Sequence, residues 1–258
     1  MKKKRLGLVL GGGSARCIAH VGVLKVLLTN NIPIDYIAGT SMGGLFGALV
    51  ALGMDIAYIE EQVLTFSWHK LIDFNFSKLG LVSFANIGAI IEKEIGEKKF
   101  RDIKIPLSII ATNLFSGKEE IFNDPEMELC LAIEASCAFP GLFNPVKIGA
   151  AYYGDGSAIN NLPVSVVKKM GADVVLAVDV IPNVELKEVP NNFALVADRA
   201  NDILIRKSSE KSYQDADVLL QPVNIDVSSI GIKHAKELLE AGEKAALARI
   251  DDIRKLIV

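Results

Sequence analysis

The chain has 258 residues, of which 50% are hydrophobic and 23% are charged, and its formal net charge is −3. This composition is typical of a globular α/β protein, and the slightly acidic balance gives no indication of a nucleic-acid partner. No stretch approaches the roughly 20 uninterrupted apolar residues of a membrane span. The 3 cysteines are odd in number and lack metal-ligand spacing, which favours a reducing, cytoplasmic setting.

The chain begins with a basic run, residues 2–5, which is followed by an apolar run over residues 6–10. The apolar run is too short for a signal peptide, and it leads to three glycines rather than to a cleavage site. Residues 6–10 are instead predicted to form a strand that is buried on both faces of a parallel sheet.

Residues 11–16, Gly-Gly-Gly-Ser-Ala-Arg, separate this strand from a predicted helix over residues 18–28. The loop lacks both the dinucleotide glycine spacing and the lysine of an ATP-binding loop. Because parallel strands end at the same edge of a sheet, we expect the loop to face the residues that follow the second strand. A plain tight turn is one interpretation, and N–H donors for an oxyanion are the other.

Residues 34–38 are mostly apolar and predict the second strand, and residues 45–52 predict a helix soon after it. Between them, Gly39-Thr40-Ser41-Met42-Gly43 has the Gly-x-Ser-x-Gly pattern of a nucleophile elbow, with Ser41 on a sharp strand-to-helix turn. An ordinary turn is the alternative interpretation, since small residues also allow a strand and a helix to pack closely.

Residues 66–84 hold the only tryptophan and four of the 11 phenylalanines. Their periodicity is poor, and polar residues interrupt the segment. Three interpretations follow: a part of the core, the wall of an acyl-binding pocket, or a mobile lid.

The rest of the chain is predicted to alternate between helices and strands. Helices are expected at residues 55–65, 87–95, 128–135, from 160–163 to 170, 192–214 and 233–256, and strands at residues 105–111, 118–122, 174–180 and 217–221. The last helix has a continuous apolar face, so we expect it to pack on the protein rather than insert in a membrane. Without repeats or a linker, residues 1–258 are expected to form a single domain.

A serine nucleophile needs a base that takes its proton. His20 lies in the first predicted helix, where a packing role is usual, and His69 lies in the aromatic segment. Asp179 and His234 follow the serine in the order of an α/β-hydrolase triad. That fold places several strands before its elbow, however, and only one strand is predicted before residue 41.

Asp155 is the other candidate base. It stands between Gly154 and Gly156, on a tight turn that lets its carboxylate approach another part of the backbone. Aromatic and aliphatic neighbours would desolvate the carboxylate and raise its pKa from the ordinary value near 4, which would make it a better base. An ordinary Asp-Gly turn is the alternative.

Three motifs occur in order along the chain: Gly-Gly-Gly-Ser-Ala-Arg, Gly-Thr-Ser-Met-Gly and Asp-Gly-Ser-Ala-Ile-Asn-Asn-Leu-Pro. Together with residues 111–117 and 135–143, they resemble the motifs of the patatin-like phospholipase family. The resemblance covers residues 6–180. It implies a three-layer α/β/α fold with a mostly parallel central sheet, and a lipid acyl hydrolase that uses a Ser–Asp dyad without histidine, metal or another cofactor.

By this resemblance Ser41 is the nucleophile and Asp155 is the base. The oxyanion and substrate-binding positions are Gly12, Gly13, Ser14 and Arg16. The implied partner is a phospholipid, a lysophospholipid or a related acyl ester, with transient, peripheral contact to a membrane.

The chain departs from the family pattern at three positions. Ser14 and Cys17 replace glycines of the first motif, and Ser157 follows Asp-Gly where the family has glycine or alanine. Cys17 is expected within a helix, where loss of glycine is favourable. A positive φ at Ser14 would strain its backbone. Two other functions therefore stand beside the hydrolase: a weak or inactive binding protein with this fold, and a triad esterase that uses His234.

Overall fold

The computed structural model describes residues 3–65, 85–186, 188, 190–223 and 234–258. Within these residues a single 8-stranded sheet lies at the centre, in the order β5-β6-β3-β2-β1-β7-β8 with β4 beside β3. The strands are β1 Leu6–Leu10, β2 Tyr36–Thr40, β3 Leu107–Asn113, β4 Lys118–Phe122, β5 Val146–Ile148, β6 Ala151–Asp155, β7 Val174–Val178 and β8 Val218–Leu220.

Strands β3, β2, β1, β7 and β8 are parallel to their neighbours in that series, whereas β4, β5 and β6 pair in antiparallel fashion. Strand β3 pairs with β4 along one edge. Along its opposite edge it pairs first with β2 and then with β6. Its residues 107–110 pair with β2, and its residues 111–113 pair with β6. The carboxyl ends of β2 and β6 therefore meet head-on along β3.

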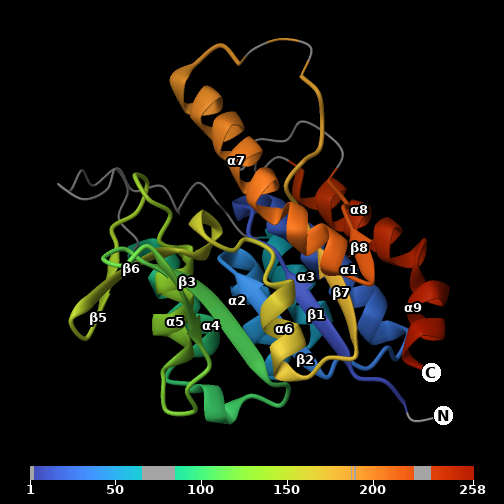
Figure 1. Ribbon diagram of the computed structural model, residues 1–258. Helices are drawn as coiled ribbons and strands as arrows, with labels where there is room; N and C mark the ends of the chain where they lie inside the picture. The colour runs from blue at the N-terminus through green and yellow to red at the C-terminus, as the bar shows by residue number, and fades with distance from the viewer. Residues whose placement is uncertain (1–2, 66–84, 187, 189, 224–233) are drawn as a thin grey trace.

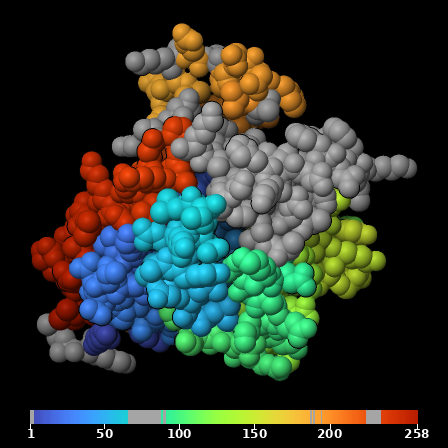
Figure 2. Space-filling model, turned by 180° about the vertical axis from the view of Figure 1, so that it is seen from behind, coloured from blue at the N-terminus to red at the C-terminus, as the bar shows by residue number. Residues whose placement is uncertain are grey.

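Helices cover both faces of the sheet (Figure 1). Helices α6 and α7 cover one face, and the other described helices cover the opposite face, where α1 packs against α3 and α8 (Figure 2). The helices are α1 Ile18–Thr29, α2 Met42–Ala51, α3 Ile56–Thr65, α4 Ala85–Ile95, α5 Leu129–Cys137, α6 Val164–Met170, α7 Phe193–Asp215, α8 Ala235–Leu247 and α9 Ile250–Ile257, with short 3-10 helices η1 Ser14–Cys17, η3 Phe100–Asp102 and η4 Gly156–Ala158.

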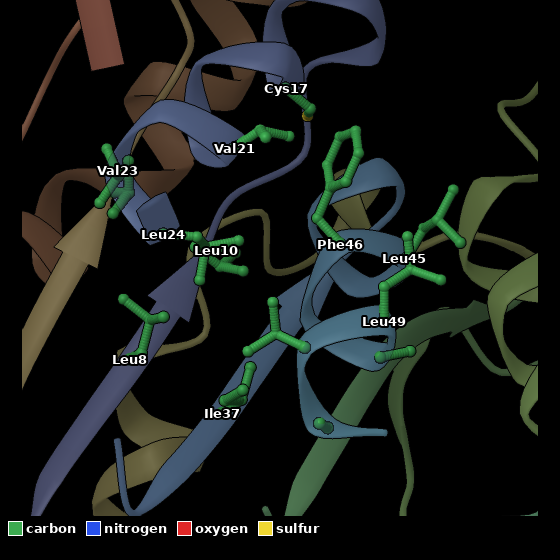
Figure 3. Packing of buried hydrophobic residues seen from close by; sticks show 14 of the residues in the cluster. Leu8, Leu10, Cys17, Val21, Val23, Leu24, Ile37, Leu45, Phe46 and Leu49 are labelled. Atoms are coloured by element: carbon green, nitrogen blue, oxygen red, sulfur yellow. The ribbon is translucent and has the colours of Figure 1, made fainter. Parts of the chain in front are cut away.

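Strand β1 is buried on both faces, as its continuous apolar sequence predicts. Successive side chains of a strand point to opposite faces, so Leu8 and Leu10 join the core under α1 and α2 while Val9 joins the core under α6. Figure 3 shows Leu8 and Leu10 packed with side chains of α1 and α2, among them Leu24 and Phe46. The expected three-layer fold with a mostly parallel sheet is confirmed.

Several predicted boundaries were wrong. Strand β2 begins at Tyr36 rather than at residue 34, because Asp35 is engaged with Leu6 through its N–H (2.9 Å) and its Oδ2 (2.7 Å). Helix α2 begins at Met42, directly after Ser41, rather than at residue 45. Residues 233–256 were expected to form one helix, but α8 ends at Leu247 and α9 begins at Ile250.

The β5–β6 hairpin was missed altogether, because residues 146–154 carry no clean alternation of apolar and polar residues. The aromatic segment 66–84 and His69 lie outside the described residues. In the described part of the chain, no helix combines the length and the apolar character that crossing a membrane requires.

Candidate active site

Ser41 stands between the end of β2 and the start of α2 with φ 55° and ψ −133°. A positive φ at a residue other than glycine is strained by about 1–3 kcal/mol and persists only where the surroundings fix it. Ser136 on α5 fixes it here: its Oγ accepts the Ser41 N–H at 2.7 Å and donates to the Ile110 carbonyl at 2.5 Å. The strand, sharp turn and helix expected of a nucleophile elbow are present.

Small residues allow the approach of strand and helix at this turn. A Cβ on Gly39 would lie 2.7 Å from Gly44, and a Cβ on Gly43 would overlap the carbonyl oxygen of Leu10 on β1. Neither position has room for a side chain, which favours the elbow interpretation over a turn that merely contains small residues.

Asp155 reaches the elbow through the arrangement of strands on β3. Thr40 pairs with Ile110, and Asp155 pairs with the next residue, Ala111. Because β2 and β6 run toward each other along this edge, the last residue of β6 lies at the point where β2 passes into Ser41. The structure therefore brings together the two residues predicted to form the dyad.

Burial controls the electrostatics of the Asp155 carboxyl, whose residue is 2% exposed. Burial raises its pKa above the ordinary 3.8, while hydrogen bonds from the Ser157 N–H (2.8 Å to Oδ1) and from the Ser41 side chain lower the pKa in part. A desolvated carboxylate accepts a proton more readily than a solvated one. The arrangement supplies what a general base for Ser41 needs.

The loop over residues 11–16, called the glycine loop below, lies against the elbow. A Cβ on Gly12 would be 3.2 Å from the Ser41 Cβ. Gly13 has φ 167° and ψ 20°, and Ser14 is exposed with φ 53°, so the strain foreseen for a serine at this position is present. Cys17, by contrast, has helical dihedral angles (φ −62°, ψ −11°) that suit any side chain.

The N–H groups of the loop differ in their availability. The Gly12 N–H donates to Oδ1 of Asn161 at 3.1 Å, whereas the N–H groups of Gly13 and Ser14 have no acceptor among the described residues. Gly13 and Ser14 can therefore offer free donors to an oxyanion, and the role of Gly12 as a donor stays a prediction.

Arg16 forms a buried ion pair with carboxylates of α7. Its side chain is 1% exposed, and Nη1 and Nη2 each contact a carboxylate oxygen of Asp202 on α7 at 2.9 Å. Asp198 lies 3.5 Å from Nη2. This buried ion pair ties η1 to α7, and a contact between Arg16 and substrate, which would require the pair to open, stays a prediction.

The histidine-based alternatives do not assemble in the described residues. His20 is buried with Nε2 2.7 Å from the Gly11 carbonyl, and burial lowers its pKa to about 4. Asp179 binds the Tyr213 hydroxyl at 2.7 Å. His234 is half-buried and pairs with Glu237 at 2.5 Å, so the triad of the esterase alternative has no support here.

Sequence reasoning missed two residues of this site, Ser136 and Asn161. Both stood inside the motifs that carried the resemblance, Ala-Ser-Cys-Ala-Phe-Pro and Asn-Asn-Leu-Pro, but neither received a role. Only their buried hydrogen bonds to the backbone of the elbow and of the glycine loop distinguish them from ordinary packing residues.

In a comparison with protein families, the model of patatin-like phospholipases matches residues 8–168. Among curated proteins, Lysophospholipase NTE1 of Yarrowia lipolytica is 34% identical over 181 residues, and Lysophospholipase nte1 of Aspergillus fumigatus is 33% identical over 183 residues. These alignments cover 68% and 69% of this chain but 12% of either relative.

Solved structures share the fold. VipD from Legionella pneumophila superposes with a TM-score of 0.64 at 12% identity, over 98% of this chain and 67% of that one. ExoU of Pseudomonas aeruginosa, in its complex with SpcU, superposes with a TM-score of 0.56 at 16% identity, over 97% of this chain and 53% of that one.

Proposed function

The chain belongs to the patatin-like phospholipase family, and from that membership we propose that it hydrolyses carboxylic esters of phospholipids or lysophospholipids. The observation that carries the proposal is the head-on meeting of β2 and β6, which puts a buried carboxylate beside a serine in a strained turn. The names of the fungal relatives, lysophospholipases, support the substrate class.

In the proposed mechanism, the Asp155 carboxylate takes the proton of Ser41 Oγ while Oγ attacks the ester carbonyl carbon. Free N–H groups of the glycine loop donate to the resulting oxyanion. The intermediate collapses to an acyl-enzyme, and protonated Asp155 gives its proton to the leaving alcohol. Asp155 next takes a proton from water, which attacks the acyl group, and Ser41 leaves with that proton restored.

Hydrolysis of p-nitrophenyl esters of increasing acyl length tests the proposal. The wild type should prefer medium or long chains, while Ser41→Ala and Asp155→Asn should both lose nearly all activity. His234→Ala is the control for the triad alternative and should keep the wild-type rate. If Asp155→Asn keeps most of the activity, Asp155 is not the base.

Peripheral contact with a membrane forms part of the proposal, and α7 supports it. Figure 1 shows this helix projecting from the body of the protein. Its outer side carries Phe193, Ile203 and Leu204, which are 88%, 54% and 69% exposed, at spacings that place them along one side. Large side chains exposed in this way suit the interface of a bilayer.

Cosedimentation with phosphatidylcholine vesicles tests this contact. The double variant Phe193→Ser/Leu204→Ser should sediment less than the wild type, while its rate on a soluble ester stays unchanged. Leu247→Ser on α8 is the matched control, because Leu247 is 54% exposed on a different helix. Equal sedimentation of all three proteins would refute a role of α7.

The same proposal treats residues 1–258 as one patatin-like domain, which the single sheet from β1 to β8 supports. A weak or inactive binding protein is the second candidate, and the positive φ of Ser14 is the observation in its favour. Labelling by a fluorophosphonate separates the two, because Ser41 in an unassembled site would react slowly.

A further inference from the structure

Each backbone N–H and carbonyl group of Gly11 and Gly12, the first two residues of the glycine loop, has a hydrogen-bond partner. Gly11 donates its N–H to the carbonyl of Val178 on β7 at 3.0 Å, and its carbonyl lies 2.7 Å from Nε2 of His20. Gly12 donates its N–H to Asn161 Oδ1 at 3.1 Å and accepts from Asn161 Nδ2 at 3.3 Å. One side chain thus engages both polar groups of Gly12, much as a neighbouring strand would.

The local structure fixes Asn161 itself. It is 1% exposed and follows the turn that begins at Asp155, in which the Asn160 N–H donates to the Gly156 carbonyl at 2.8 Å. The Thr40 hydroxyl donates to the Asn160 carbonyl at 2.9 Å. The segment that carries Asn161 is therefore bonded to the residue immediately before the nucleophile.

Gly12 lies between Asn161 and the elbow. A Cβ on Gly12 would be 2.7 Å from Asn161 Oδ1 and 3.2 Å from the Ser41 Cβ, so the Gly12 backbone fills the space between the Asn161 amide and the nucleophile. In this arrangement the Gly12 N–H already has the Asn161 side chain as its acceptor. The next two N–H groups, of Gly13 and Ser14, stay free among the described residues.

We infer that Asn161 is a positioning residue: by engaging both polar groups of Gly12, it aims the Gly13 and Ser14 N–H groups at the oxyanion formed on Ser41. The inference rests on the proposed hydrolase function. Donors that are fixed before the reaction stabilise developing charge far better than donors that must reorganise. A loop without Asn161 would still bind substrate but would stabilise the transition state less.

The test compares Asn161→Ala with Asn160→Ala, a matched control because the Asn160 amide binds Glu119 and not the glycine loop. On a p-nitrophenyl ester, Asn161→Ala should lower kcat about 100-fold and change KM less than about threefold. The Ki of a trifluoromethyl ketone, which forms a tetrahedral adduct with serine, should rise by the same factor as kcat/KM falls. Asn160→Ala should change none of these values by more than about threefold.

A second variant, Asn161→Asp, keeps the acceptor for the Gly12 N–H but places an oxygen against the Gly12 carbonyl. It should show the same loss, and it decides the question if Asn161→Ala does not fold. If the wild type cleaves esters and the variants keep kcat within about threefold, the inference is wrong and the proposed function stands. If the wild type cleaves no ester, both fall. In that case, faster deuterium exchange at the Gly12 amide in Asn161→Ala would show that Asn161 only holds the loop in place and has no part in a reaction.

Discussion

Replacement of Ser136 by alanine should weaken both the fold and the elbow. The Ser136 hydroxyl is fully buried, accepts the N–H of Ser41 and donates to the carbonyl of Ile110. Its removal leaves two buried polar groups without a partner. It also removes the contact that holds the positive φ of the nucleophile.

The magnitude follows from the cost of unsatisfied groups. A buried N–H or C=O that loses its partner costs about 1–3 kcal/mol, so the two together lower the free energy of unfolding by about 2–6 kcal/mol. A loss of about 3 kcal/mol corresponds to a thermal midpoint lower by about 6–12 °C in a protein of this size. If the strain of about 1–3 kcal/mol is no longer held in the productive geometry, kcat should fall about 5- to 160-fold.

Thermal unfolding and ester hydrolysis measure the two effects, with Ser108→Ala as the matched control. Ser108 is also fully buried, but its hydroxyl makes only long contacts, at 3.3 Å to Asn123 and 3.4 Å to the sulfur of Met170. That control should lose about 1 kcal/mol or less and keep its kcat. Equal losses of stability in the two variants, with kcat unchanged in both, would refute the assignment of Ser136 to the elbow.

Three further outcomes are expected. Burial raises the pKa of Asp155 in the folded state, so ionisation of its carboxyl lowers the stability of the wild type at neutral pH. Asp155→Asn should therefore unfold at a higher temperature than the wild type at pH 7. The difference should vanish as the pH falls toward the pKa of the unfolded state, near 3.8. Asp202→Asn leaves the Arg16 guanidinium with a single carboxylate at 3.5 Å and should lower the free energy of unfolding in urea by about 3 kcal/mol. Asp173→Asn, which breaks an exposed ion pair, should lower it by about 1 kcal/mol or less, and equal losses would contradict this account. Ser14→Gly relieves the positive φ but frees the unfolded chain, so it should gain about 0.5–1 kcal/mol with kcat no lower than that of the wild type; a destabilised variant would show that the serine side chain has favourable contacts.

The sequence by itself determined the parts of this protein that depend on near neighbours. The continuous apolar run of β1, the small residues around Ser41 and the amphipathic face at the C-terminus all act over a few residues, and each occurs in the structure. The same local signals placed β2 two residues early, because Asp35 is engaged with Leu6 of another strand, and they joined α8 to α9 across a break that the apolar pattern does not mark.

Only the tertiary structure decided how the site is assembled. The pairing of β6 with β3 brings Asp155 to Ser41 across more than a hundred residues of chain, and it was invisible because the β5–β6 hairpin has no clear pattern. Arg16 was assigned to the oxyanion loop by motif, yet its charge is neutralised by α7. Asn161 was a motif residue without a role until its amide was found on both polar groups of Gly12. Contacts of this kind depend on the path of the whole backbone, which no local pattern specifies.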